Sequence, residues 1–436
     1  MLPRREHGWP ASLSNAPAHP LLFQPLKVGP LELRNRVICG AHFTMFTEPN
    51  PVWGEPGFYG RRYGRYLADR ARGGVAAVIA GKTAVAPNTA YKMPNNANGW
   101  DEACIPHYEE LTSQVHEHGA LAFLRLTHSG AMMLGNWSKQ VAVGPSPSPD
   151  YFETPREMDD GDIRAAIDAH VTCAVNAKKG GFDGIEIQSA HGYLLHQFLS
   201  PKFNYRTDEY GGSIENRMRF GMQIVDAARE AVGDTVAVGI RLTGDDEQSQ
   251  GLSGLTAGDC AEVAAAYEQS GLVDFLNVSV GIGGVGIMRT NYAPHLFGVY
   301  AAHKVREAVR DTPVFTVHRI LMPDEAEGII ERGEADGITL VRALIADPEW
   351  VNKAREGRDD EIRRCPAEVE ACIASHPAVA ACAVVGTADA KWGEIVVAHV
   401  VTRDGVDVTP DELDRHCRER LAAYKRPRQF EFVERL

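Results

Sequence analysis

Short apolar segments recur along the first 360 residues and alternate with longer, more polar segments. The short segments carry Val, Ile, Leu and Ala at consecutive positions, which is typical of strands that are buried on both faces. There are eight of them, and they span residues 36–41, 75–81, 120–126, 182–188, 236–242, 273–280, 313–318 and 337–341.

The segments between these runs have the length and composition of helices, and glycines close several of them. Strict alternation of strand and helix predicts an α/β fold, and eight such units predict a closed (β/α)8 TIM barrel. A doubly wound open sheet shows the same alternation and remains the structural alternative. The expected helices span residues 59–72, 105–118, 160–179, 214–231, 257–270, 300–310, 323–332 and 348–355.

The pattern changes at both ends of the predicted barrel, which we place at residues 21–365. Residues 1–20 are polar and proline-bearing, without an apolar core of a signal peptide, and predict a flexible N-terminal arm. Residues 366–436 predict a small α+β C-terminal domain. Its expected elements are helices at 366–375 and 410–423 and strands at 379–385, 394–401 and 430–433.

Composition narrows the class of protein. A net charge of -13 disfavours binding to nucleic acid or to anionic membranes, and no run of eighteen apolar residues predicts a membrane span. None of the eight cysteines forms a C-x-x-C pair. Free, buried thiols fit a reducing compartment, so we expect a cytoplasmic protein. Separately, we expect a small-molecule substrate and allow for a homo-oligomer.

The predicted strand ends carry residues suited to a flat, phosphorylated ligand. Small residues at the ends of strands 1 and 2 would let a ring approach the backbone, while cations after strands 7 and 8 match the usual phosphate site of such barrels. Long loops at 127–159 and 281–298 follow strands 3 and 6, at the end of the barrel where active sites form.

Three polar side chains cluster at the exit of strand 4, where Gln188, His191 and Tyr193 lie within six residues. Three such side chains at one strand exit favour a functional role more strongly than a single polar residue would. A lone strand-end histidine such as His128 is more often structural than catalytic, and Arg342 could simply pair with a carboxylate of a helix.

At these residues the chain resembles the old yellow enzyme family. The resemblance rests on IEIQSAHGYLLHQFLSPKFNYRTDEYGGSIENRMRF (185–220), on LLFQPLKVGPLELRNRV (21–37) and on RILMPDEAEGIIERGEADGITLVRALIADPEWVNKAREG (319–357). It covers residues 21 to about 365 and is most similar to the branch of trimethylamine dehydrogenase and 2,4-dienoyl-CoA reductase. The resemblance implies FMN reduced by NADPH or NADH, and we expect this FMN to be noncovalent because Phe43 stands where a flavin-attaching cysteine would be. The positions that would hold the FMN are Gly40, Ala41, Gly81, Arg125, Arg241, His318, Arg319, Val341 and Arg342.

The family's chemistry implies roles for the strand 4 cluster. Gln188 and His191 would hydrogen-bond a substrate carbonyl oxygen, and Tyr193 would protonate the α-carbon after hydride reaches the β-carbon of an activated alkene. An FMN-dependent amine dehydrogenase or N-demethylase is the alternative, since His191 aligns with a histidine of the amine oxidisers. Against it, Gln188 replaces the tyrosine expected there.

Several positions depart from the family pattern. Arg125 stands where glutamine or glutamate usually meets the flavin pyrimidine, so it would stabilise negative charge there or point elsewhere. Phe43 occupies the place of the cysteine that attaches the flavin covalently in trimethylamine dehydrogenase. Cys365 is followed next by Cys372, with Glu368 at the expected cysteine position, so no iron–sulfur cluster and no other metal is expected.

Residues 366–436 resemble the C-terminal domain of acyl-CoA synthetases and other adenylate-forming enzymes. The segments PAEVEACIASHPAVAACAVVGTADAKWGEIVVAHVV and TPDELDRHCRERLAAYKRPRQFEFVERL carry this resemblance. The chain stops before the motif with the adenylation lysine, and Lys425 is not that lysine. The tail would be a docking or oligomerisation module, or a remnant of a gene fusion. A third reading is therefore a non-catalytic scaffold whose tail binds an acyl-CoA or a partner.

Overall fold

The computed structural model describes residues 17–48, 57–89, 97–133, 140–148, 153–246, 254–281, 294–363, 367–389, 393–403, 405–421 and 426–435. Eight parallel strands form a closed barrel, in which each strand pairs with its neighbour and β3 pairs with both β15 and β6. The predicted TIM barrel is confirmed, and this closure excludes the open sheet. The barrel strands are β3 (Val37–Cys39), β6 (Ala77–Ala84), β8 (Leu121–Thr127), β11 (Gly184–Ser189), β12 (Ala237–Asp245), β13 (Phe275–Val280), β14 (Val314–Thr316) and β15 (Gly337–Leu340).

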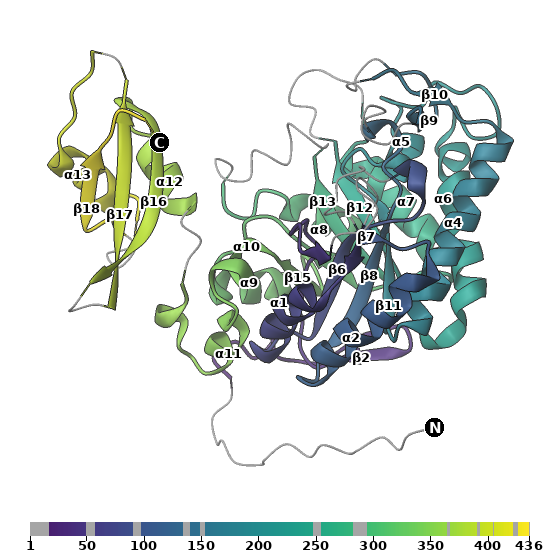
Figure 1. Ribbon diagram of the computed structural model, residues 1–436, viewed down its shortest axis with the longest axis horizontal. Coiled ribbons are helices and arrows are strands. Elements are labelled where there is room, and N and C mark those ends of the chain that lie inside the picture. The colour runs from purple at the N-terminus through teal and green to yellow at the C-terminus, as the bar shows by residue number, and fades with distance from the viewer. Residues whose placement is uncertain are drawn as a thin grey trace.

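Helices surround the barrel and bury its outer face (Figure 1). Two of them begin with reciprocal caps. Asp159 and Asp162 cap the helix at Asp160–Lys179, which lies between β8 and β11, and Thr256 and Asp259 cap the helix at Ala257–Ser270, which follows β12. The surrounding helices are α1 (Arg61–Arg72), α2 (Ile105–His116), α4 (Asp160–Lys179), α6 (Ile214–Val232), α7 (Ala257–Ser270), α8 (Val299–Ala308), α9 (Pro323–Glu331) and α11 (Trp350–Arg355).

The lower half of the barrel interior is filled with apolar side chains. Phe123, Phe275 and Phe315 pack against one another there, with Ile38 and Ile79 beside them. An antiparallel hairpin, β1 (Leu26–Val28) with β2 (Leu31–Leu33), contributes Val28 and Leu33 to the same cluster. Because this end is closed by packing, the polar residues of the opposite end are free to form a site.

Short elements that the sequence pattern did not predict lie at the upper end. The loop after β8 contains β9 (Val143–Gly144) and β10 (Arg156–Glu157), which pair in parallel. The others are β4 (Thr47–Glu48), β5 (Phe58–Tyr59), β7 (Ala97–Asn98), α5 (Leu194–Leu199) and α10 (Arg342–Ala346).

The C-terminal residues form a second small core. A sheet in the order β16 (Val379–Asp389), β17 (Gly393–Thr402) and β18 (Gln429–Phe432) packs against α12 (Ala367–Ala374) and α13 (Pro410–Arg418). The predicted small α+β domain is confirmed. Figure 1 shows it beside the barrel, in yellow-green.

The predicted N-terminal arm falls largely on residues 1–16, outside the described residues. His19 is buried, and its Nε2 lies 2.7 Å from a carboxylate oxygen of Asp359, so the arm is anchored at this histidine. None of the described helices has the length and apolar character needed to cross a membrane.

Candidate active site

Small residues line the upper rim of the barrel at β3 and β6. A Cβ on Gly40 would lie 2.5 Å from Cγ2 of Thr339, and a Cβ on Gly81 would lie 2.8 Å from Cβ of Arg125. Gly81 also has a φ of +158°, which side chains disfavour. Side chains larger than hydrogen would therefore not fit at Gly40 and Gly81, where the backbone packs closely against Thr339 and Arg125.

A charged network fills the barrel interior beneath this rim. Arg125 of β8 donates to the fully buried Glu186 of β11. Asn277 of β13 donates to the other oxygen of Glu186 at 2.8 Å and accepts from Arg241 at 2.5 Å. Thr339 also donates to the Asn277 oxygen, at 3.1 Å. One network thus joins five of the barrel strands, namely β8, β11, β12, β13 and β15.

This network carries two guanidinium groups for one carboxylate. Burial, and next the charge of Arg125, lowers the pKa of Arg241 to about 9. Nε of Arg241 is buried without a hydrogen-bond partner. The surplus positive charge means that an anionic group bound above the network would be stabilised.

Gln188 and His191 lie side by side at the exit of β11. Nε2 of Gln188 is 3.3 Å from Nδ1 of His191, and the other ring nitrogen of His191 is 2.7 Å from the Ser279 hydroxyl. His191 has a φ of 62°, and its N–H donates to the Thr243 hydroxyl at 2.9 Å. Burial, followed by the charge of Arg241, holds the pKa of His191 well below its usual value, so this ring is neutral at pH 7.

The buried Oε1 of Gln188 lacks a hydrogen-bond partner. A buried oxygen of this kind normally accepts a hydrogen bond. Nε2 of Gln188 also donates to the Ala190 backbone oxygen at 3.4 Å. Exchanging the two amide atoms would cost this long bond, but it would let His191 donate from Nδ1 to Oε1, with Ser279 donating to Nε2. The Gln188 amide would then present its N–H groups where the unpartnered oxygen now lies.

Tyr193 precedes α5 and occupies its N-cap position, with the side chain half-buried. The turn before it is held by His196, whose Nδ1 accepts from the Gly192 N–H at 2.8 Å and whose Nε2 lies 2.7 Å from Asp246. The ammonium of Lys82 lies 4.8 Å from the centroid of the Tyr193 ring.

The predicted phosphate end combines unusual backbone with two arginines. His318 and Arg319 have φ values of 96° and 53°. Nε2 of His318 accepts from the Val280 N–H at 2.8 Å, and burial lowers the pKa of His318 to about 3. The His318 ring is thus neutral and supplies no charge, so the cations of this end are Arg319 and, at the start of α10 after Val341, Arg342.

His128, the other strand-end histidine, is buried in a structural environment. Its Nδ1 accepts from the Gly130 N–H at 3.0 Å, and its ring stacks on that of His170. Burial, and next His170, keeps its pKa well below the usual value. These contacts favour the structural role over catalysis.

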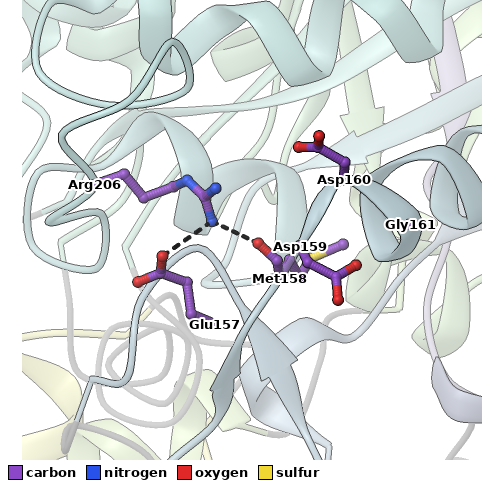
Figure 2. Close-up of a pocket in the computed structure, with 6 residues that line it drawn as sticks. All are labelled: Glu157, Met158, Asp159, Asp160, Gly161 and Arg206. Carbon is purple, nitrogen blue, oxygen red and sulfur yellow. Dashed lines mark hydrogen bonds and ion pairs between the residues drawn. The ribbon is translucent and has the colours of Figure 1, made fainter.

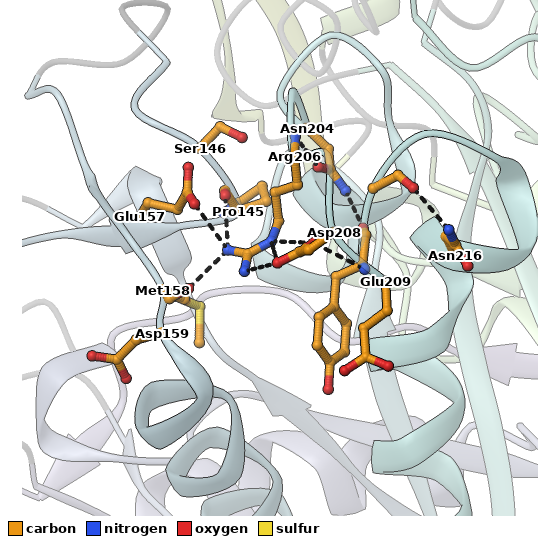
Figure 3. A network of polar contacts seen from close by, with 12 residues as sticks. Pro145, Ser146, Glu157, Met158, Asp159, Asn204, Arg206, Asp208, Glu209 and Asn216 are labelled. Carbon is orange, nitrogen blue, oxygen red and sulfur yellow. Dashed lines mark hydrogen bonds and ion pairs between the residues drawn. The ribbon is translucent and has the colours of Figure 1, made fainter.

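At the outer rim, Arg206 joins the loop after β8 to the segment after α5. Its Nη1 donates to the backbone oxygens of Pro145 at 3.2 Å and Met158 at 2.7 Å, and Asp208 accepts from its other nitrogens. Figure 3 shows these bonds converging on one guanidinium. Figure 2 shows Arg206 and Glu157 lining a surface pocket beside the start of α4. The long loop after β8 is therefore held by Arg206 at its middle, at Pro145, and near its end, at Met158.

Sequence reasoning missed several of these groups. Glu186, Asn277 and Ser279 sit inside apolar strands, and Arg206 lies in a loop. The one available signal was Glu186 itself, because a carboxylate within a buried strand needs a partner.

The described residues fit a flavin. Gly40 and Gly81 leave the backbone bare at the rim, and the Arg125–Arg241 pair would favour negative charge on a bound ring. Arg319 and Arg342 would suit a phosphate, and the buried Oε1 of Gln188 and Nε of Arg241 have no hydrogen-bond partner. The fold and the site together define a flavin-binding (β/α)8 oxidoreductase barrel.

Comparison with known proteins identifies the family. Residues 21–361 match the NADH:flavin oxidoreductase / NADH oxidase family, and the chain belongs to this family. Residues 368–436 match the C-terminal domain of AMP-binding enzymes. Both resemblances seen in the sequence are confirmed.

Among curated relatives, "NADH oxidase" of Thermoanaerobacter brockii is 37% identical over 79% of this chain and 52% of its own length. "N,N-dimethylglycine/sarcosine dehydrogenase" of Chromohalobacter salexigens is 33% identical over 79% of this chain and 49% of its own. A solved complex of 2-naphthoyl-CoA reductase is 28% identical, with a TM-score of 0.74 over 80% of this chain and 54% of that one. The chain thus spans about half the length of these relatives.

Proposed function

We propose that the chain uses noncovalent FMN and NADPH or NADH to reduce an activated C=C bond, that of an α,β-unsaturated carbonyl compound or enoyl thioester. The observation that carries this proposal is the Gln188–His191 pair at the exit of β11, with Tyr193 two residues later in the chain and with His191 within the electrostatic reach of Arg241 and Arg125. The similarity to 2-naphthoyl-CoA reductase, whose substrate is a thioester by its name, supports the thioester class.

Bound FMN would supply a hydride from its N5. The backbone of Gly40, Ala41 and Gly81 would lie along its ring, and Arg241 would stabilise its reduced, anionic form. Arg319 and Arg342 would hold the phosphate, with the backbone around His318 and Val341 completing that end.

The chain's own residues would then bind and protonate the substrate. Gln188, with its amide turned as described above, donates to the substrate oxygen, and His191 orients this amide. As negative charge grows on that oxygen, these hydrogen bonds strengthen. Tyr193 gives the proton to the α-carbon.

The test separates the two half-reactions. The purified chain should be yellow, should bleach with NADPH or NADH, and should regain its colour when 2-cyclohexenone is added. Tyr193→Phe should bleach as fast as the parent but regain colour about 10²-fold more slowly or worse, because only the second step needs the proton. Colour that returns no faster than in buffer would overturn the proposal.

Oxidation of an N-methylated amine is the second candidate. It is favoured by the similarity to N,N-dimethylglycine/sarcosine dehydrogenase. Against it, the described strand 6 exit presents Asn277 and Ser279, which are buried and already bonded to Arg241 and His191. Bleaching by sarcosine without any nicotinamide would favour this candidate.

We further propose that the chain divides into an N-terminal arm at 1–20, the barrel at 21–365 and the module at 366–436. We also propose that the protein works in the cytoplasm. A third proposal is that it carries no iron–sulfur cluster. The seven described cysteines are free thiols, which supports a reducing compartment. Cys365 and Lys425 lie outside the described residues. Iron analysis of the purified protein tests the absence of a cluster. A chain that takes up no FMN would instead favour the scaffold.

A further inference from the structure

Lys82 is a charged residue that the proposed chemistry has not used. It follows Gly81 in β6 and lines a small cavity with Phe43, Tyr59 and Gly81. Its ammonium lies 4.8 Å from the centroid of the Tyr193 ring. A cation at this distance from an aromatic ring is attracted to the ring, and it also stabilises negative charge on the ring's oxygen.

The groups around Lys82 come from three elements. Tyr193 faces it from the turn after β11, and Tyr59 of β5 lines the same cavity. His128, at the end of β8, feels the charge of Lys82, which helps to keep the pKa of His128 low. Burial raises the pKa of Tyr59, so Tyr59 and His128 are both uncharged at pH 7. The group beside Lys82 whose charge is expected to change during catalysis is Tyr193.

We propose that Lys82 is a positioning residue whose ammonium makes the Tyr193 phenol a stronger acid. The inference rests on the proposed function, in which Tyr193 is the proton donor. When the Tyr193 O–H bond breaks, its proton forms the new C–H bond at the substrate α-carbon. The electron pair stays on the phenolate, whose charge the Lys82 ammonium offsets. Water then returns the proton to Tyr193.

The effect should depend on pH in a defined direction. Burial lowers the pKa of Lys82 to about 7. The ammonium is therefore present below pH 7 and lost above it. An opposite charge within about 4–6 Å of an ionising group lowers its pKa by about one unit or more. The protonation step should be assisted at pH 6 and unassisted at pH 9.

Two variants of the full, flavin-loaded chain test the charge of Lys82. Lys82→Met removes the charge and keeps a long side chain, whereas Lys82→Arg keeps the charge. At pH 6 the parent and Lys82→Arg should regain colour with 2-cyclohexenone roughly three- to tenfold faster than Lys82→Met. At pH 9 the parent should fall to the rate of Lys82→Met, whereas Lys82→Arg should stay fast because arginine keeps its charge. Bleaching by NADPH should be equal in all three.

A readout independent of activity is the ionisation of Tyr193, followed by NMR of ¹³C-labelled tyrosine and assigned with Tyr193→Phe. Its pKa should be about one unit lower in Lys82→Arg than in Lys82→Met. Equal pKa values overturn the inference, as does a Lys82→Met effect on KM alone, which would make Lys82 a substrate ligand. If Tyr193→Phe itself regains colour normally, the proposed proton donor fails instead.

Discussion

At the scale of single residues, the site depends on how charge is balanced inside the barrel. Glu186 is fully buried and contacts Arg125 directly and Arg241 through Asn277. Removing one member of a buried ionic group lowers the free energy of unfolding by more than the intact group contributes to it, because the remaining charges stay buried without a partner.

Glu186→Gln should therefore destabilise the flavin-free chain by about 3 kcal/mol, since both guanidinium groups lose their carboxylate. Urea unfolding measures the change. The matched control is Glu209→Gln, because Glu209 is exposed and should change stability by less than about 0.5 kcal/mol. Equal effects of the two substitutions would show that the network is not what stabilises the interior.

Lys82 should also affect stability in a pH-dependent way. Its pKa is about 7 in the folded chain, against an ordinary value of 10.5. Between these values the unfolded chain binds a proton that the folded chain does not, so the folded state gains stability as pH rises from 7 to 10.5.

Lys82→Met removes this dependence. The variant should be more stable than the parent by on the order of 2–4 kcal/mol at pH 6, and the difference should shrink toward pH 10. Denaturant unfolding of the flavin-free proteins at both pH values checks this. Lys304→Met, at an exposed position, serves as the control and should give no trend with pH.

At the scale of elements, the loop after β8 is held by contacts from one distant side chain. Arg206 binds the backbone just after β9 and just after β10, so one guanidinium joins the two strands of this short parallel pair at their C-terminal ends. A loop anchored in this way can present the same face to each substrate molecule.

Arg206→Met should release the loop. Amide hydrogen exchange at residues 140–148 and 153–158 should accelerate by about tenfold or more, because charge-assisted bonds to two carbonyls are lost. FMN affinity should stay unchanged. Arg156→Met is the control: the Arg156 side chain is half exposed in its pair with Asp162, and such pairs contribute little. Unchanged exchange in Arg206→Met would show that other contacts hold the loop.

The sequence pattern predicts the long elements well and the short ones poorly. The eight barrel strands are nearly continuous apolar runs, and such runs predict from the sequence alone that both faces of a strand are buried. The strands β9 and β10 have two residues each and pair across eleven intervening positions, so they leave no periodicity. The partner of Arg125 is Glu186, 61 positions away, and only the closed barrel brings the two together. The three proposed catalytic residues could be predicted from the sequence because all of them lie within six residues at the exit of one strand.

At the scale of the whole molecule, two separate apolar cores coexist. The barrel core extends to Ile362, and the core of the module begins at Val369. Val369, Ile373, Leu413 and Cys417 pack between α12, α13 and the small sheet. Among the described residues, none belongs to both of these cores, so each core should unfold in its own transition.

A chain ending at residue 363 should therefore bind FMN and unfold within about 2 °C of the barrel transition of the full chain. Calorimetry and flavin content measure this. A chain ending at residue 346 is the control. It loses Trp350, which is fully buried and donates to the Leu321 backbone oxygen at 2.9 Å, so it should fail to fold. Loss of FMN from the longer truncation would make the module part of the flavin enzyme.

The closure of the barrel also sets the order in which it can be completed during synthesis. Ile38 of β3 pairs with Thr339 of β15, about 300 residues later in the chain. At roughly 5–20 residues per second, a ribosome needs roughly 15–60 s to deliver that partner. Throughout this interval one side of β3 presents unpaired backbone groups, so the nascent chain is the form of this protein that most needs a chaperone.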